Sequence, residues 1–351
     1  NVYFMQKILE NFYGIIFVLF LVVFSKLLSE MFLLNNIFVS SAFISILLGL
    51  MVGNFFQLNK QIQWFAELSL KKILRVGIAF LGIGLSVAEL IEYGSISIFL
   101  VIMNIVLVFI ILFYLCKLFK IPKTLGYLIT MGTSICGVTA VIATSSIIKA
   151  KKNETSYAVA IVTLFGMITV FTYPYLAHYL FKDFPEFAGV FLGTSINDTA
   201  QVSAAGYIYS ENYNSESALN ASMTTKLLRN SFLVFLIPLI AYMSAQKDSL
   251  SIKGSIKSFF PLFVIGFIFF SLVRSLGDQF IIDDNLVFYW EKLIDLIKTS
   301  SKYCILLAMV SLGLQTNIKE LTKLGYKPLI IGFVASISIG IISIIFLKNF
   351  V

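Results

Sequence analysis

Two short segments rich in glycine and hydroxyl side chains have the residue types and spacing that could bind an ion. The first reads, in order, Gly132, Thr133, Ser134, Ile135, Cys136, Gly137, Val138 and Thr139. The second reads Gly193, Thr194, Ser195, Ile196, Asn197, Asp198, Thr199, Ala200 and Gln201. Such small residues let a helix unwind, and the freed N–H groups of a half-helix attract anions, whereas freed carbonyl groups can hold a cation.

Both segments begin with the same tetrapeptide, Gly-Thr-Ser-Ile. A plainer interpretation is that small residues only let two helices pack closely, as small-xxx-small patterns do in many membrane helices. The repetition, together with the charge pattern described below, favours the ion-binding interpretation over the packing one.

Asp198 is a carboxylate in the middle of the second segment, and Asn197 precedes it. An acidic residue within an apolar segment is a functional hypothesis by default, because its burial is costly. We therefore expect Asp198, with the amide of Asn197, to bind a coupling proton or sodium ion. The alternative is a carboxylate that only caps a half-helix.

Lys226 and Arg229 lie three residues apart, followed by Asn230, near the start of another apolar segment. Residues at this spacing project from one face of a helix. Two cations on one face suit an oxyanion, since arginine can bind it with two donors and lysine adds a point charge. The alternative is that both side chains extend to the lipid headgroups.

The composition places these residues in a membrane. Hydrophobic residues make up 59% of the 351 residues, charged residues only 13%, and the mean hydropathy is +0.94. Apolar stretches long enough to span a bilayer recur along the whole chain, so no soluble domain remains. The formal charge of +8 comes from lysines in short connections, and we interpret them as topology signals rather than as a nucleic-acid site.

The chain is therefore predicted to be an all-α polytopic membrane protein with about 10–11 segments in one transmembrane domain. Its approximate halves cover residues 11–180 and 185–348, and residues 1–4 resemble the remains of an expression tag. The predicted segments cover residues 11–30, 36–54, 74–90, 94–116, 124–148, 156–180, 185–209, 218–245, 258–276, 288–314 and 326–348.

Charge bias marks the segments at 124–148 and 185–209 as unusual. Lysines stand on both sides of the first of these segments, whereas acidic residues stand on both sides of the second. A simple crossing would place the two ends of a segment on opposite sides of the membrane. We infer that both segments are either re-entrant hairpins from opposite faces or discontinuous helices, so that an inverted-repeat transporter is expected. A weaker echo links 79–86 with 308–315, although the repeat boundaries do not follow from it.

These motifs resemble the YeiH-type family of bacterial inner-membrane proteins, over nearly the whole chain. The resemblance rests on the two glycine-led segments, on Lys226 to Asn230, and on the stretches 82–86 and 311–315. The family name implies sulfate export, and relatives are associated with sulfite or sulfonate metabolism. The resemblance also implies a fold similar to bile-acid symporters and sodium/proton antiporters, in which a core domain lies beside a panel domain.

A secondary transporter agrees best with these features. The chain lacks a Ser-His-Asp set, a His-Glu-x-x-His run, a phosphate-binding glycine loop and a cysteine metal cluster, so we expect neither an enzyme nor a cofactor. A channel would need a continuous pore, whereas opposed helix breaks are typical of alternating access. The first hypothesis is export or symport of a small oxyanion through the two segments, Lys226, Arg229 and Asn230, coupled through Asp198. The second is a cation/proton antiporter that uses Asp198, and small-residue surfaces could support a homodimer.

Overall fold

The computed structural model describes residues 10–34, 39–243, 262–281, 284–317 and 326–349. The described regular structure is helical, and five of its helices are long and apolar enough to cross a membrane. These are Phe12–Leu34, Val87–Leu118, Asn153–Phe181, Phe263–Phe280 and Tyr326–Lys348. The prediction of an all-α polytopic membrane protein is confirmed. Residues 1–4, with the predicted tag remains, lie outside the described residues.

The chain falls into two compact units, each of which takes segments from both predicted halves. Unit 1 comprises residues 1–89, 207–215 and 263–319, and unit 2 comprises residues 90–206, 216–262 and 320–351. The core-and-panel arrangement and the inverted repeat stay predictions.

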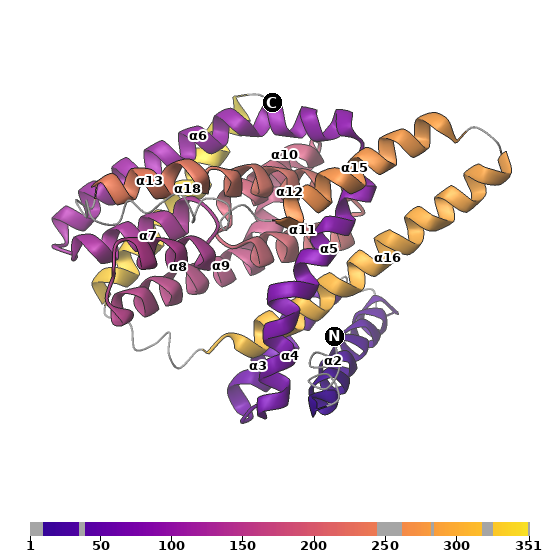
Figure 1. Ribbon diagram of the computed structural model, residues 1–351, viewed down its shortest axis with the longest axis horizontal. Helices are drawn as coiled ribbons and strands as arrows, with labels where there is room; N and C mark the ends of the chain where they lie inside the picture. The colour runs from indigo at the N-terminus through magenta and orange to yellow at the C-terminus, as the bar shows by residue number, and fades with distance from the viewer. Residues whose placement is uncertain (1–9, 35–38, 244–261, 282–283, 318–325, 350–351) are drawn as a thin grey trace. The chain divides into compact units, whose positions relative to one another are not determined.

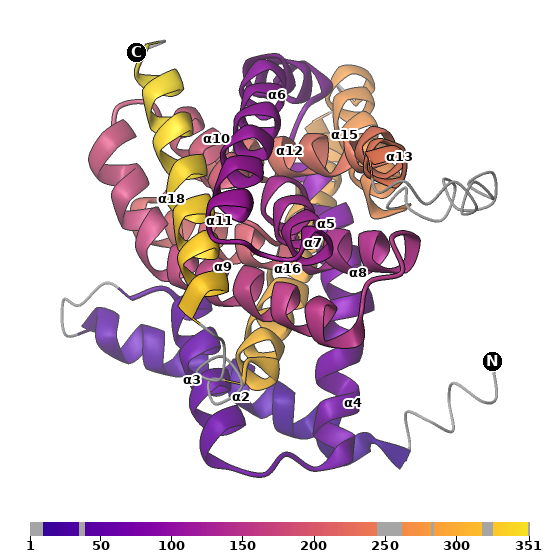
Figure 2. The same cartoon turned by 90° about the vertical axis from the view of Figure 1, so that its left-hand side faces the viewer.

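Unit 2 is organised around the long helix α9, Lys152–Phe181, which at 1.5 Å per residue extends for about 45 Å. Four helices pack against it, namely α7 (Lys123–Ser134), α8 (Val138–Ile147), α10 (Pro185–Ser195) and α18 (Tyr326–Lys348). The unit also contains most of α6 (Val87–Leu118), the first half of α11 (Thr199–Tyr213), α12 (Glu216–Ser231) and α13 (Leu233–Met243). Figure 1 shows α7, α8 and α9 side by side, and Figure 2 shows α18 beside α9.

The helices α7 and α8 form a hairpin, which we call the first hairpin. Gly132 on α7 packs against Val141 on α8. The Thr124 hydroxyl, at the start of α7, donates to the Glu154 carboxylate at the start of α9, over 2.6 Å. Since α8 is joined to α9 by a short connection, both open ends of the hairpin lie at the same end of α9.

The helices α10 and α11 form the second hairpin, which opens at the other end of α9. Gly189 on α10 lies against Ala218 on α12, and Gly193 lies against Ser222, so α10 and α12 run parallel. Gly206 on α11 also lies against Ser222, which places α11 as the returning arm. At Ala218, near the start of α12, the chain is back beside the first turns of α10. Three residues separate the end of α9 from the start of α10. Both segments are therefore hairpins, the shape that the first of the two predicted alternatives requires, and their re-entry into the membrane stays a prediction.

Three predicted segment boundaries are wrong. The segment predicted at 74–90 is a helical stretch that already begins with α4, Lys60–Leu68, and continues through a π-helical turn, Ser69–Ile73, α5, Leu74–Leu81, and a 3₁₀ turn, Gly82–Gly84. The charged stretch before residue 74, predicted as a connection, contains the amphipathic helix α4. This helix buries Ile62, Phe65 and Ala66.

The acidic connection predicted at 90–94 lies inside α6. The Glu89 amide donates to the Ser86 hydroxyl over 3.2 Å, and the Ser86 amide donates to the Glu89 carboxylate over 2.8 Å. This reciprocal pair is a capping box, which starts a helix at the point where the acidic residues indicate a loop. The segment predicted at 218–245 is also divided, because α12 ends at Ser231 and α13 begins at Leu233.

Unit 1 packs α16, Asp284–Gln315, against α3, Ser41–Phe55, and against α5. Gly49 on α3 and Gly313 on α16 lie directly against each other's backbone, which allows the two helices to approach closely. The remaining members are α2, Phe12–Leu34, and α15, Leu262–Phe280, of which residues 263–280 belong to this unit. Of the echoed stretches, 79–86 contains the break after Gly84, whereas 308–315 stays helical.

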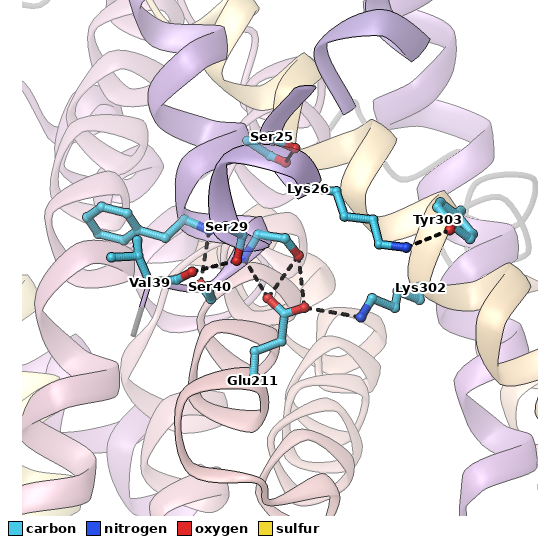
Figure 3. Close-up of polar contacts among 11 residues, drawn as sticks. Ser25, Lys26, Ser29, Val39, Ser40, Glu211, Lys302 and Tyr303 are labelled. Atoms are coloured by element: carbon cyan, nitrogen blue, oxygen red, sulfur yellow. Dashed lines mark hydrogen bonds and ion pairs between the residues drawn. The ribbon is translucent and has the colours of Figure 1, made fainter. Parts of the chain in front are cut away.

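A carboxylate holds the first turn of α3 in place. Glu211, in the second half of α11, accepts hydrogen bonds from the Ser41 amide, over 2.7 Å, and from the Ser41 hydroxyl, over 2.8 Å. Figure 3 shows the Lys302 ammonium pointing to the same carboxylate, and the two groups are 3.2 Å apart. A negative charge at a helix N-terminus is favourable, because it satisfies N–H groups that have no partner within the helix.

We expect Glu211→Gln to lower the melting temperature of the purified protein, because the change removes the charge from the Ser41 and Lys302 contacts. The loss should correspond to about 1–2 kcal/mol. The control is Glu67→Gln, which breaks an exposed ion pair with Lys71 and should cost less than about 0.5 kcal/mol. Equal melting temperatures for the two variants would contradict the role given to Glu211.

The hairpin topology predicts which residues share a side of the membrane. Single cysteines at Lys123 and Lys149, in a background without Cys116, Cys136 and Cys304, should react with an impermeant maleimide from one side. Cysteines at Asp183 and Glu216 should react from the other side. Reaction of Lys123→Cys and Lys149→Cys from opposite sides would mean that α7 and α8 together cross the bilayer.

Candidate functional site

The tips of the two hairpins, residues 135–137 and 196–198, meet inside unit 2. The second tip is fixed to the middle of α9, since the Asn197 amide donates to the Val162 carbonyl over 3.5 Å. The Gln201 amide likewise donates to the Thr163 carbonyl over 3.2 Å. Gly132, at the end of the first hairpin's α7, also lies against Val162. The two glycine-led motifs predicted from the sequence therefore come together at one point.

Lys226 on α12 connects both tips. Its ammonium group donates to the carbonyl oxygens of Ile135, at 2.8 Å, of Ile196, at 3.1 Å, and of Asn197. A lysine has three N–H donors only when it is protonated, so this arrangement is that of a charged ammonium group with every donor in use. The side chain is fully buried.

Arg229, one turn further along α12, also donates hydrogen bonds to backbone carbonyls of both hairpins, mostly to those just before the tips. Its Nε donates to the Ser134 carbonyl over 2.8 Å. Its Nη1 donates to the carbonyls of Thr194, at 2.7 Å, and Ile196, at 2.9 Å, and its Nη2 donates to the Thr133 carbonyl. Four of the five N–H donors that a guanidinium carries are thus used. The side chain is 1% exposed.

These contacts explain how two helices can end at this depth. The last carbonyl groups of a helix have no partner within it, and a cation near the C-terminus also interacts favourably with the helix dipole. Lys226 and Arg229 provide both donors and charge for α7 and α10. The alternative that both side chains extend to headgroups is wrong. The pair also lies near the end of α12 rather than near the start of a segment, because α12 ends at Ser231.

Asp198 lies at the N-termini of the second helix of each hairpin, α8 and α11. Its Oδ1 accepts a hydrogen bond from the Ala200 amide, in the first turn of α11, over 2.9 Å. The carboxylate also interacts with the amide of Val138, the first residue of α8, and it lies beside Gly137, which directly precedes that helix. A single carboxylate therefore caps two helix N-termini that come from different hairpins, and it interacts electrostatically with Lys226.

Gly137 makes this double cap possible. Its φ of +71° lies in the left-handed region, which residues with a Cβ adopt at a cost. A Cβ at this position would also lie 2.8 Å from Asp198 Oδ2. The glycine therefore has two independent reasons to be there.

Several polar atoms at the tips are buried and have no hydrogen-bond partner in the described structure. They are the hydroxyl oxygens of Ser134 and Ser195 and the side-chain oxygens of Asn197 and Asn230. The Asn230 amide nitrogen donates to the Thr199 hydroxyl over 3.1 Å, which places Asn230 at the N-terminus of α11. Burial of an unpaired polar group costs about 1–3 kcal/mol. Such atoms are therefore candidates for contact with a bound ion or molecule.

The predicted residues differ in how accessible they are. Thr139 is exposed, and Asp198 and Thr199 are half-buried. The remaining ones are buried, namely Gly132, Thr133, Ser134, Cys136, Gly137, Gly193, Thr194, Ser195, Asn197, Gln201, Lys226, Arg229 and Asn230. The accessible side of the site is thus the side of the two helix N-termini.

The sequence prediction missed a second layer of polar residues that supports the hairpins. The hydroxyls of Ser97 on α6 and Thr225 on α12 are 2.6 Å apart. The Asn104 amide on α6 donates to the Ser343 hydroxyl on α18 over 2.9 Å, and Ser343 lies 3.0 Å from the Thr194 hydroxyl. An asparagine in an apolar run, as in the stretch around Asn104, is the signal that could have identified this layer.

Among the described residues, no group of three or more histidine, cysteine, aspartate or glutamate side chains could hold a metal ion. The charged residues at the tips are Lys226, Arg229 and Asp198, so two positive charges face one negative charge. The roles predicted for these side chains, direct anion binding for the cations and ion coupling for Asp198, stay predictions.

The fold and this site define a multi-pass bacterial membrane protein in which two hairpins meet at buried charges. A family model described as conserved hypothetical protein 698 matches residues 13–332, and the chain belongs to this family, the YeiH-type family suggested by its motifs.

Relatives of similar length support this assignment. A UPF0324 membrane protein of Fusobacterium nucleatum is 33% identical over 279 residues, which cover 78% of this chain and 80% of the relative. UPF0324 membrane proteins of Streptococcus agalactiae and Clostridium tetani are each 30% identical, over 304 and 346 residues. These alignments cover 86% and 94% of this chain, and 87% and 94% of the respective relatives. No solved structure matches the chain.

We expect Arg229→Gln to lower the melting temperature strongly. The change leaves the carbonyls of Thr133, Ser134 and Thr194 without this donor, at about 1–3 kcal/mol for each buried group. Arg274→Gln is the control, because it breaks a partly exposed ion pair with Asp278. If both variants unfold at the same temperature, Arg229 does not hold the hairpins together.

Proposed function

We propose that this protein is a secondary active transporter that exports a small oxyanion of the sulfate, sulfite or sulfonate type by alternating access, with proton or sodium coupling through Asp198. One observation carries the proposal. At the point where the two hairpin tips meet, two buried cations, Lys226 and Arg229, are accompanied by a single carboxylate, that of Asp198, which interacts electrostatically with Lys226. A buried excess of positive charge is unfavourable, and a bound anion would neutralise it.

Three further features support an anion at this place. The half-helices α8 and α11 direct their N-termini to the same point, where dipoles favour negative charge. The buried hydroxyls of Ser134 and Ser195 are unpaired and can donate to an oxyanion. The two hairpins open at opposite ends of α9, an arrangement that suits a site reached alternately from two sides.

In this proposal Lys226 and Arg229 act mainly through their field. Seven of the eight N–H donors that a lysine and an arginine carry together are directed to backbone carbonyls. One Arg229 donor is left for an anion, so the direct contacts would come mostly from hydroxyls and from backbone amides at the helix N-termini.

We expect sulfate, sulfite or a small sulfonate to raise the melting temperature of the detergent-purified protein, since a ligand that binds only the folded state stabilises it. Ser134→Ala and Ser195→Ala should each weaken binding by about tenfold, the loss of one hydrogen bond to a charged group. Ser271→Ala is the matched control, because its hydroxyl is also buried and unpaired but lies in unit 1.

Transport is measured in proteoliposomes loaded with the anion that gives the largest shift. Efflux that depends on a proton or sodium gradient is the expected result. No stabilisation by any of these anions, or equal binding by the Ser134, Ser195 and Ser271 variants, would count against an oxyanion site at the tips.

Cation/proton exchange is a second candidate, for which a separate observation speaks. The side-chain oxygens of Asn197 and Asn230 are buried and unpaired. Asn197 precedes Asp198 in the chain, and the amide nitrogen of Asn230 bonds the hydroxyl of Thr199, the residue after Asp198. Carboxylate and amide oxygens are suitable ligands for a hard cation. Stabilisation by sodium or by pH alone, lost in Asp198→Asn, would favour this function.

A further inference from the structure

The carboxylate of Asp198 already occupies the place that suits an anion best. It accepts a hydrogen bond from the Ala200 amide, at the N-terminus of α11, and it lies against Gly137 and interacts with the Val138 amide, at the N-terminus of α8. The surroundings of these two termini also contain the buried, unpaired side-chain oxygen of Asn230, whose amide nitrogen bonds the first residue of α11. The site thus contains a resident anion and a polar group without a partner.

This end of the site is also where a ligand can arrive. Thr139 is exposed, and Val138, Asp198 and Thr199 are half-buried, whereas Lys226 and Arg229 on the carbonyl side are closed off. A substrate that enters here meets the Asp198 carboxylate first. Two negative charges cannot share one pair of helix termini without strong repulsion.

We propose that the substrate oxyanion and the ionised Asp198 carboxylate compete for the paired N-termini of α8 and α11, so that the oxyanion binds together with one proton on Asp198. This inference rests on the proposed function and specifies its coupling. The proton converts the carboxylate into a neutral carboxylic acid, which releases the Val138 and Ala200 amides to the oxyanion. The carboxylic acid can then donate a hydrogen bond to the same oxyanion.

The charged groups that face Asp198 agree with this exchange. Lys226 on α12 and the Cys136 thiol of the first tip interact electrostatically with Asp198, and Arg229, one turn along α12 from Lys226, adds the second positive charge at the tips. Val162 and Thr163, which contact the second tip from the middle of α9, are uncharged. With Asp198 ionised, the three charges sum to one positive charge. With Asp198 protonated they sum to two, so a divalent oxyanion with its proton leaves the site neutral.

The test uses binding of sulfate and methanesulfonate, whose charges are constant between mildly acidic and mildly alkaline pH. Binding to the purified full-length protein is measured by isothermal titration at a series of pH values. If one proton is taken up with each anion, the affinity should rise about tenfold for each unit by which the pH falls, until Asp198 is protonated in the free protein. In buffers of different ionisation enthalpy, the heat should report uptake of one proton.

Asp198→Asn mimics the protonated side chain and should bind the anion with the affinity that the parent reaches only at low pH, without dependence on pH. Asp198→Ser retains an oxygen that can cap α11 and serves as the second variant if Asp198→Asn does not fold. Asp278→Asn removes a carboxylate of unit 1 that is paired with Arg274, and it should leave the pH dependence unchanged.

The outcomes separate the two levels of the proposal. Binding by the parent that does not change with pH, weaker binding by both Asp198 variants, or binding that needs sodium instead of a proton would overturn the competition and leave anion transport standing. If neither anion binds to the parent or to a folded Asp198 variant at any pH, the proposed function fails as well.

Discussion

The carbonyl groups at the ends of α7 and α10 need hydrogen-bond donors at a depth where lipid offers none. A helix that ends inside a membrane is tolerated only where protein or water satisfies its last backbone groups. Here α12 supplies both donors and charge, because Lys226 and Arg229 bond the carbonyls of both hairpins at once. Without these hydrogen bonds the last carbonyl groups of α7 and α10 would lack donors, and the helix breaks would be unfavourable.

The charges at the tips follow a simple electrostatic order. Positive side chains lie at the C-termini of α7 and α10, and the negative side chain of Asp198 lies at the N-termini of α8 and α11. Each charge therefore compensates two helix dipoles from different hairpins. Such an arrangement links the two hairpins at their tips. It also means that a change in the charge of one side chain affects both hairpins simultaneously.

The sequence predicted the two broken segments because a repeated tetrapeptide coincided with opposed charge patterns, and in the structure both segments are hairpins. It could not predict that Lys226 and Arg229 bond backbone carbonyls, because side-chain spacing says nothing of what a helix face meets. The start predicted at residue 74 was wrong, since hydropathy does not detect an amphipathic helix such as α4. The end predicted at residue 90 was wrong because Ser86 and Glu89 form a capping box that begins α6. Isolated polar residues such as Asn104 were overlooked because the high hydropathy of a long apolar segment hides a single polar side chain.

The long separation between the hairpins and the residues that satisfy them has a consequence for biosynthesis. Lys226 lies 91 residues after Ile135, whose carbonyl it bonds, and Arg229 lies 96 residues after Thr133. The first hairpin therefore leaves the ribosome with its terminal carbonyls still without these donors. Until α12 has been inserted, this hairpin can lower its free energy only by staying near the aqueous interface or near water in the insertion machinery. Completion of the hairpins is thus a late step that requires α12.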